Sequence, residues 1–203
     1  KDISLNFWKL VNFKIFGEGV KGVLIGNEGW LFTDEEFSQP DNYLENIKNN
    51  QDYILSVREQ LSNIDLFIIP VPAKSRIYEE KLGRYKMPAY RGRIYADFIE
   101  FLGGTNINHV NLLPVFLENK GQNLFYKTDT HWTAEGAQLA AGNSLKPLSN
   151  IAFKVEGKED AHFTGDLVKY TSEKSFTKET YKSYNVIGGS EEDLFGDQYF
   201  PVV

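Results

Sequence analysis

The chain has 203 residues, of which 41% are hydrophobic and 25% charged, which is enough apolar material for one packed domain. Its net charge of -6 and the lack of dense Lys/Arg runs exclude a typical nucleic-acid-binding protein. It contains no cysteine, which excludes disulfides, thiolate nucleophiles and cysteine-based metal sites.

Helical and strand-like segments alternate along the chain. Apolar residues at helical spacing predict helices over residues 5–16, 41–62, 90–102, 112–117 and 133–148. Apolar runs bounded by turn residues predict a hairpin over residues 23–32 and strands over residues 66–69 and 107–110. The tail alternates short β-like runs with polar turns. This order predicts one α/β domain over residues 1–203. The domain is expected to be layered, with a mainly parallel sheet flanked by helices and a β-rich C-terminal portion.

Two of these elements carry specific expectations about burial. In the helix over residues 41–62, Asp41 is the expected N-cap, and apolar residues such as Leu44 and Leu55 form the face expected to be buried. The run over residues 66–69 is expected to be a buried strand that ends at Pro70.

The catalytic candidates are Asp129 and His131. An aspartate two residues before a histidine faces the same side only in extended backbone, because on a helix the two side chains diverge. Thr133 is the expected N-cap of the following helix, which leaves both residues outside it. A carboxylate bonded to one ring nitrogen fixes the tautomer and leaves the other nitrogen as a general base. The alternative is a surface-loop histidine beside a turn aspartate.

The segment Asp129–Thr133, followed by Glu135-Gly136-Ala137, resembles the Asp-His block of the alginate O-acetyltransferase family. These are SGNH-hydrolase-like proteins of the AlgJ and AlgX type. Further matches follow in the same order as in the family, over residues 22–37, 70–78 and 165–167.

The resemblance implies an SGNH-hydrolase-like α/β fold that works in the periplasm or elsewhere outside the cytoplasm. The family moves acetyl groups onto hydroxyls of an exopolysaccharide, alginate-like or cellulose-like, through Ser, His and Asp, so that Asp129 would orient His131 and His131 would be the base. The implied partners are the polysaccharide and a membrane-bound O-acyltransferase that supplies the acetyl group. A membrane anchor would lie N-terminal to this chain. The alternatives are an acetylesterase of the same fold and a non-catalytic polysaccharide-binding or scaffold domain of a secretion complex.

The resemblance places the nucleophilic serine in a Gly-x-Ser turn that follows a strand downstream of His131. Ser190 does not fit, because the carboxylates of residues 191–193 would oppose a developing oxyanion. The apolar run over residues 199–203 is expected to lead into that turn, which predicts that the domain continues past Val203 and that the chain as given is inactive. Ser75, just beyond a strand, is the runner-up nucleophile.

Three residues are candidates for binding substrate. Lys74 and Arg76 would hold a polysaccharide carboxylate, and Trp132 would stack on a sugar ring. The alternatives are ordinary solvated charges for the two cations and packing behind His131 for the tryptophan.

No metal or cofactor is expected. Asp129 occupies one nitrogen of His131, and cysteines are absent. The alternative is a zinc site in which His162, which follows Glu159 and Asp160, joins His131 and Asp129, but no HExxH-type spacing supports it.

Overall fold

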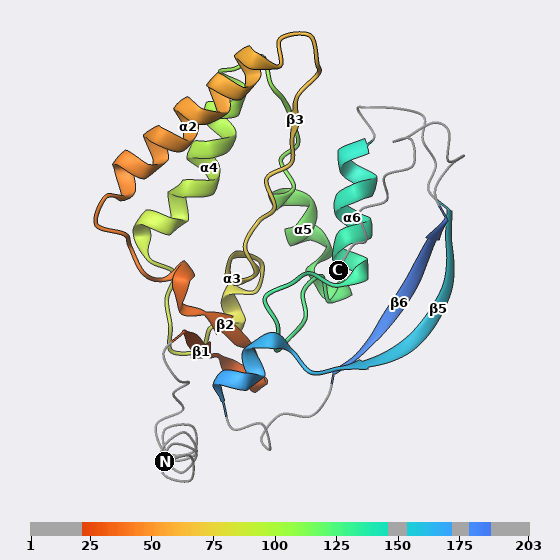
Figure 1. Cartoon of the computed structure of the whole chain (residues 1–203). Coiled ribbons are helices and arrows are strands. Elements are labelled where there is room, and N and C mark those ends of the chain that lie inside the picture. The colour runs from red at the N-terminus through yellow and green to blue at the C-terminus, as the bar shows by residue number, and fades with distance from the viewer. Residues whose placement is uncertain (1–21, 146–153, 172–178, 188–203) are drawn as a thin grey trace.

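The structure is a computed structural model that describes residues 22–145, 154–171 and 179–187 (Figure 1). Its helices and strands are, in chain order, β1 (Val23–Ile25), η2 (Asn27–Gly29), β2 (Leu31–Thr33), η3 (Asp34–Glu36), α2 (Tyr43–Gln60), β3 (Phe67–Ile68), α3 (Lys74–Ile77), η4 (Glu79–Lys81), α4 (Ala89–Gly103), β4 (Asn108–His109), α5 (Leu113–Asn119), η5 (Lys120–Gln122), α6 (Ala134–Leu145), β5 (Lys154–Phe163), η6 (Asp166–Tyr170) and β6 (Glu179–Ile187). The helix expected over residues 5–16 and the apolar run over residues 199–203 lie outside the described residues, as does Ser190.

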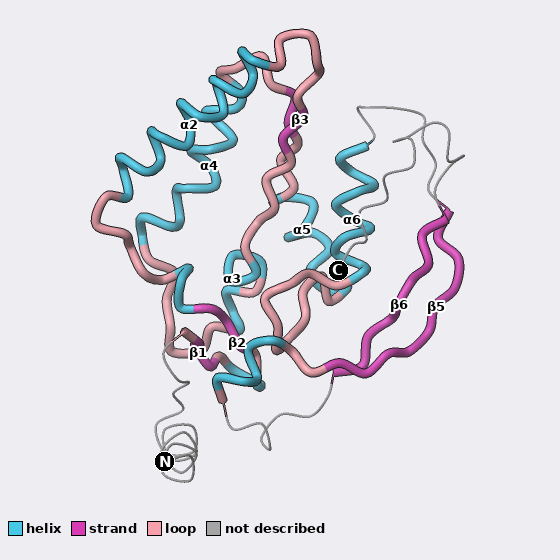
Figure 2. The backbone as a smooth tube through the Cα atoms, viewed as in Figure 1, coloured by secondary structure: helices cyan, strands magenta, loops and turns pink. Residues whose placement is uncertain are grey.

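The strands of the described residues form three separate two-stranded sheets (Figure 2). β1 and β2 pair antiparallel around the turn η2, which confirms the predicted hairpin, and β5 and β6 form a longer antiparallel pair. Among the strands of the described ranges, only β3 and β4 pair parallel, over two residues each. The expected mainly parallel sheet is therefore wrong for the described residues, because most of their β-like runs pair antiparallel.

The main core lies where the β1–β2 hairpin meets α3, α5 and α6. Its buried members are mostly aromatic residues and leucines: Trp30, Phe32, Ile77, Tyr78, Leu82, Leu112, Phe116, Leu124, Phe125 and Ala140. A smaller cluster packs η6 against the same hairpin through Val23, Leu31, Leu167 and Val168. The β1–β2 hairpin thus packs against both α3 and η6.

Helices α2 and α4 lie side by side, away from α5 and α6 (Figure 1). Their contact includes the edge-to-face rings of Tyr43 and Tyr90, 5.5 Å apart. α2 begins after Asn42 rather than at a capping Asp41, and none of its residues is buried, with Leu44 left 71% exposed. The expectation of a buried α2 face is wrong for the described structure, because α4 lies beside α2 without burying any of its residues. β3 is likewise only half-buried.

Helix α6 begins directly after the candidate catalytic segment. Thr133 Oγ1 accepts a hydrogen bond of 3.1 Å from the main-chain N–H of Gly136, which confirms the predicted N-cap. A Cβ at Gly136 would lie 2.2 Å from the main-chain oxygen of Leu124, so only glycine allows this approach. The first turn of α6 is therefore fixed against residues 123–125, and Asp129 and His131 lie outside the helix as expected.

Across the described ranges, no helix combines the length and the apolar character needed to cross a membrane.

Candidate active site

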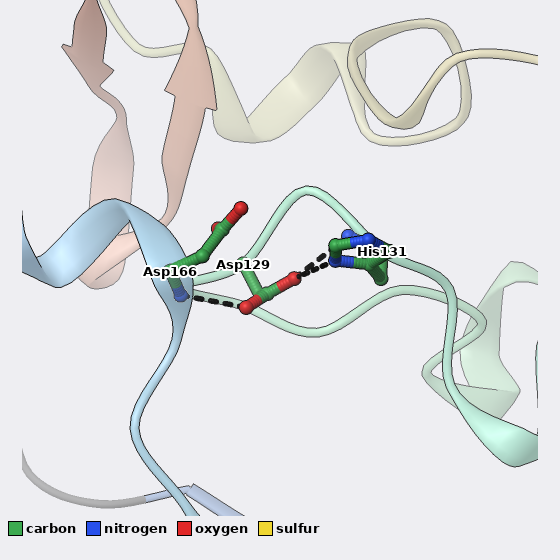
Figure 3. A group of neighbouring side chains, drawn as sticks. All are labelled: Asp129, His131 and Asp166. Carbon is green, nitrogen blue, oxygen red and sulfur yellow. Dashed lines mark hydrogen bonds and ion pairs between the residues drawn. The ribbon is translucent and has the colours of Figure 1, made fainter. Parts of the chain in front are cut away.

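Asp129 and His131 form a hydrogen-bonded pair in the irregular segment before α6 (Figure 3). Asp129 Oδ1 lies 2.5 Å from His131 Nδ1 and also accepts the main-chain N–H of His131 at 2.9 Å. The other oxygen, Oδ2, accepts the main-chain N–H of Asp166 at 2.6 Å. The Asp129 side chain is 3% exposed and that of His131 is 66% exposed. A buried, doubly anchored carboxylate thus holds a ring that solvent can reach.

The carboxyl group of Asp129 is held in its ionised form. Burial favours the neutral acid, but the N–H groups of Asp166 and His131 and the imidazole together lower the pKa of Asp129 below its ordinary value. An ionised carboxylate accepts hydrogen bonds only, so Nδ1 carries the proton that faces it. Nε2 is then the nitrogen with a free lone pair, which is the arrangement of a general base.

The segment around Asp129 has no regular structure, yet its main chain is firmly bonded. The N–H groups of Lys127 and Thr128 donate to the Glu179 carboxylate on β6, at 2.7 and 2.6 Å. Leu31 N–H donates to Lys127 O at 3.0 Å, and Leu167 N–H donates to Thr128 O at 3.2 Å. β2, η6 and β6 therefore fix the segment from different directions, which satisfies main-chain groups that a helix or a sheet would otherwise satisfy.

Lys74 lies beneath this segment rather than facing substrate. Its side chain is buried, and Nζ donates to the main-chain oxygens of Leu31 (2.6 Å), Lys127 (3.0 Å) and Asp129 (2.9 Å). An ammonium group has three N–H donors, so none remains for a ligand. The expectation that Lys74 holds a polysaccharide carboxylate is therefore wrong.

The surroundings of the Lys74 ammonium are largely apolar. The rings of Trp30 and Phe32 each lie with their centroids 5.1 Å from Nζ. Burial lowers the pKa of Lys74 to about 7, although the negative charges of Glu179 and Asp129 act to raise it.

Ser75 and Arg76 also have structural partners. Ser75 is fully buried and its hydroxyl donates to the carboxylate of Glu36, so it cannot meet a polymeric substrate and does not fit the role of runner-up nucleophile. The Arg76 guanidinium donates to the main-chain oxygens of Gly92, at 3.1 Å, and of Arg91. Arg76 thus ties α3 to the first turns of α4, and this placement gives no support to its expected contact with substrate.

Trp132 follows His131 directly and pairs with Phe125 through an isolated β-bridge. Its half-buried ring packs against the main core, as the packing alternative predicts. Stacking of Trp132 on a sugar stays a prediction. His162 lies exposed on β5, where Nδ1 is 3.2 Å from Thr180 Oγ1.

The structure brings together a different group of potential metal ligands from the group with His162 that the sequence analysis considered. Among the described residues, potential ligand atoms of Asp129, His131 and Asp166 lie within 4.8 Å of one another, and His162 is not in that group. Both oxygens of Asp129 already accept hydrogen bonds, and both oxygens of Asp166 accept from Thr130. These carboxylate oxygens thus already have hydrogen-bond partners within the protein. The absence of a metal stays a prediction.

Sequence reasoning missed the roles of Gly165, Asp166 and Glu179. A Cβ at Gly165 would lie 2.0 Å from Thr128 O, so glycine is needed where η6 docks on the candidate segment. In the sequence, residues 165–167 are only a short match to the family, and nothing in them indicates this contact. Glu179 carries no local signal, because its partners are about fifty residues away, at separations of 51 and 52.

Comparison with known proteins gives consistent results. Residues 23–203 match the family described as "SGNH hydrolase-like domain, acetyltransferase AlgX". The probable alginate O-acetylase AlgJ of Azotobacter vinelandii is 37% identical over 181 residues, which cover 84% of this chain and 47% of the relative. The chain thus spans about half the length of the curated relatives it matches.

Solved structures agree with that match. The O-acetyltransferase domain of Pseudomonas putida AlgJ has a TM-score of 0.77 at 26% identity, with 84% of this chain and 66% of that chain covered. Pseudomonas aeruginosa AlgX has a TM-score of 0.60 at 20% identity, with 86% and 46% covered, and shares the fold.

Proposed function

The chain belongs to the AlgX family of SGNH hydrolase-like acetyltransferase domains, and we propose that its Asp129–His131 pair serves O-acetyl transfer to a polysaccharide. The membership accounts for the SGNH-like fold expected from the sequence. The observation that carries the proposal is the 2.5 Å contact between Asp129 Oδ1 and His131 Nδ1, made by a buried carboxylate to an exposed ring. A surface-loop histidine beside a turn aspartate would not bury the aspartate.

In the proposed reaction the ring of His131 moves one proton in each half. Nε2 takes the proton of a serine hydroxyl while the serine oxygen attacks the acetyl carbonyl, and it returns that proton to the departing group of the donor. Nε2 then takes the proton of a sugar hydroxyl while that oxygen attacks the acetyl-serine, and it returns the proton to the serine. The acetyl group has moved to the sugar, and the ring ends neutral. Asp129 stabilises the imidazolium formed in each half. The described residues leave the serine unassigned.

The names of the relatives suggest the acceptor and the location. The AlgJ relatives are probable alginate O-acetylases, which supports an alginate-like polysaccharide as acceptor. The proposal also includes the cellulose-like acceptor and the periplasmic site of action that the family resemblance implies. It also includes a membrane-bound O-acyltransferase as the source of the acetyl group.

The test uses the full-length natural protein with an activated acetyl ester and alginate oligosaccharides, and mass spectrometry reads the products. Acetylated oligosaccharide, lost in His131→Gln and kept in His109→Gln, is the expected result. His109 is a matched control because it lies on β4, outside the Asp129–His131 pair, and its ring Nδ1 is 3.0 Å from the main-chain oxygen of Ile107, just before that strand. Release of free acetate alone would indicate an esterase. Polysaccharide binding without any acetyl-enzyme would indicate a scaffold domain and would overturn the proposal.

A further inference from the structure

A pocket of about 660 Å³ lies beside the candidate active site. The two ends of the loop that carries Asp129 and His131 pair with each other, since Tyr126 N–H donates to His131 O at 3.2 Å. Tyr126 and Thr133, at the base of this loop, both line the pocket. Thr133 follows His131 by two residues, which span at most about 7 Å. A polymer that presents one sugar to His131 can therefore place a neighbouring sugar in the pocket.

The lining of this pocket suits a sugar ring. Its buried aromatic members are Trp30, Tyr78 and Phe125, and the ring centroids of Trp30 and Tyr78 lie 4.5 Å apart. Exposed polar side chains, such as Gln122 and Asn123, complete the lining. A sugar has apolar C–H faces and hydroxyl groups at its edge, so it can meet aromatic rings with one and hydrogen-bonding groups with the other.

Two of the three lysines in the lining are paired with carboxylates. Lys81 Nζ lies 2.7 Å from Glu28 Oε2, and Lys120 Nζ lies 3.1 Å from Glu80 Oε1. Each pair offers both donors and acceptors to a hydroxyl group, but its charges balance. These two lysines are therefore not free cations for an anionic ligand.

Two further carboxylates of the lining are also offset within the protein. Glu179 accepts the main-chain N–H groups of Lys127 and Thr128, at 2.7 and 2.6 Å, and its charge acts on the buried Lys74 ammonium. Glu135 lies in the first turn of α6, where the helix dipole favours a negative charge. These arrangements weaken the repulsion that the two carboxylates would exert on an anion in the pocket.

Lys127 is the remaining cation of the lining. Its main chain is held by Glu179 and by Leu31, whereas its ammonium group makes no hydrogen bond or ion pair with the other described residues. The Lys81 ammonium lowers the pKa of Glu28, and the charge of Lys127 adds to this effect. The Lys127 ammonium therefore lies on the Glu28 side of the pocket, on a main chain that is already fixed.

We propose that this pocket is a subsite for an acidic sugar of the acceptor polysaccharide, and that the Lys127 ammonium binds the carboxylate of that sugar. The paired charges and the amide side chains would bind its hydroxyl groups. The cation that the sequence placed at Lys74 is thus replaced by one that faces a pocket. The inference rests on the proposed function for the identity of the acceptor, and the binding itself is tested without catalysis.

The first experiment measures binding by calorimetry, with the full-length natural protein and no acetyl donor. Alginate oligosaccharides are compared with cello-oligosaccharides of the same length. Lys127→Met should weaken alginate binding about tenfold, the size expected when a hydrogen bond to a charged group is lost. Lys127→Arg, which keeps the charge, should retain most of the affinity. Lys48→Met, at an exposed lysine on α2, is the matched control and should change nothing.

Two further measurements separate the charge of Lys127 from a general change in structure. Added salt should narrow the difference between the wild type and Lys127→Met, because it screens exposed charges. In acetyl-transfer assays, Lys127→Met should raise KM for alginate with kcat unchanged, as expected for a group that only binds substrate. Lys127→Gln provides the same comparisons if the methionine variant does not fold.

A second pair of variants tests the location of the subsite. A Cβ at Gly121, which lines the pocket, would have no atom within 4 Å, so a large side chain has room there. Gly121→Trp should therefore obstruct the pocket and weaken alginate binding. Gly103, at the end of α4, also has open space around a built Cβ but does not line the pocket. Gly103→Trp should bind as the wild type does.

The outcomes separate this inference from the proposed function. Wild-type affinity for alginate in Lys127→Met or in Gly121→Trp would overturn the subsite, as would tighter binding of the cello-oligosaccharide by the wild type. A wild-type protein that binds alginate through Lys127 but transfers no acetyl group would contradict the proposed function alone.

Discussion

The Lys74 ammonium donates a hydrogen bond of 2.9 Å to the main-chain oxygen of Asp129, the residue that holds the His131 ring. The same ammonium binds the main-chain oxygens of Leu31 and Lys127, so one buried cation joins β2 to the candidate catalytic segment. A buried charge is costly unless its donors are all satisfied, and here three carbonyl oxygens satisfy them. The position of Asp129 thus depends on a residue 55 positions earlier in the chain.

The first prediction concerns the contribution of Lys74 to stability. Lys74→Met removes the donor shared by the oxygens of Leu31 and Asp129 inside the protein. A buried acceptor that loses its partner costs about 1–3 kcal/mol, so the free energy of unfolding should fall by at least about 2 kcal/mol. Urea denaturation followed by tryptophan fluorescence measures it. Lys86→Met, at an exposed lysine, should stay within about 0.5 kcal/mol of the wild type, and equal losses in both variants would contradict the prediction.

The second prediction concerns pH. Burial lowers the pKa of Lys74 to about 7 in the folded protein, whereas the unfolded chain keeps the ordinary 10.5. Between these values the folded state has lost a proton that the unfolded state retains, so stability should rise with pH. The slope from this group approaches about 1.4 kcal/mol per pH unit.

Lys74→Met should lack this part of the slope, and the difference between the two proteins isolates it from other titrating groups. Direct titration of the Lys74 side chain by ¹³Cε NMR gives an independent measure. A midpoint close to the ordinary value would refute the pH prediction.

The third prediction compares two glycines. Gly165→Ala would place a Cβ 2.0 Å from Thr128 O, so η6 must shift away from the candidate segment, and a loss of about 1–3 kcal/mol is expected. Gly142, in the interior of α6, has nothing within 4 Å of a built Cβ. Gly142→Ala should therefore stabilise the protein by about 0.5–1 kcal/mol. Thermal unfolding of both variants should give shifts of opposite sign, and a Gly165→Ala variant as stable as the wild type would show that the steric argument fails.

The features that the sequence predicted correctly are local. Asp129 and His131 are two residues apart, and Thr133 caps an N–H three residues later, so both contacts are local. The contact of Asp129 with His131 was predicted correctly, but it forms across a bend closed by the His131 N–H on Asp129 Oδ1, whereas extended backbone was expected. The β1–β2 hairpin likewise closes over a few residues around η2. Such contacts depend on short spacings that periodicity and turn chemistry reveal.

The features that the sequence did not predict depend on residues far apart in the chain. Lys74 looks like a surface cation until the oxygens of Leu31 and Asp129 are known to surround it. Glu179 and Asp166 look like ordinary acidic residues, although each binds main-chain N–H groups of the candidate segment. Burial of a polar group is a property of the assembled elements, and spacing within one element does not report it.

The last prediction concerns Asp129 itself and is made for the full-length enzyme. Asp129→Asn keeps the size of the side chain, and its amide oxygen can still accept the main-chain N–H of Asp166. The amide NH₂ would then face His131 Nδ1, which would have to become an acceptor, so the proton would move to Nε2. The same NH₂ would face the main-chain N–H of His131, which would lose its acceptor. The ring would lose its function as a base.

Because the ring is left in the wrong tautomer, kcat for acetyl transfer should fall by roughly 10³–10⁴-fold, the loss known when the carboxylate behind a catalytic histidine becomes an amide. KM should change little, since Asp129 is buried and does not face substrate. Steady-state assays with an activated acetyl ester measure both constants, and Asp97→Asn on α4 serves as the matched control. A kcat within tenfold of the wild type, in a variant whose NMR spectrum confirms the folded state, would show that Asp129 does not orient a catalytic base.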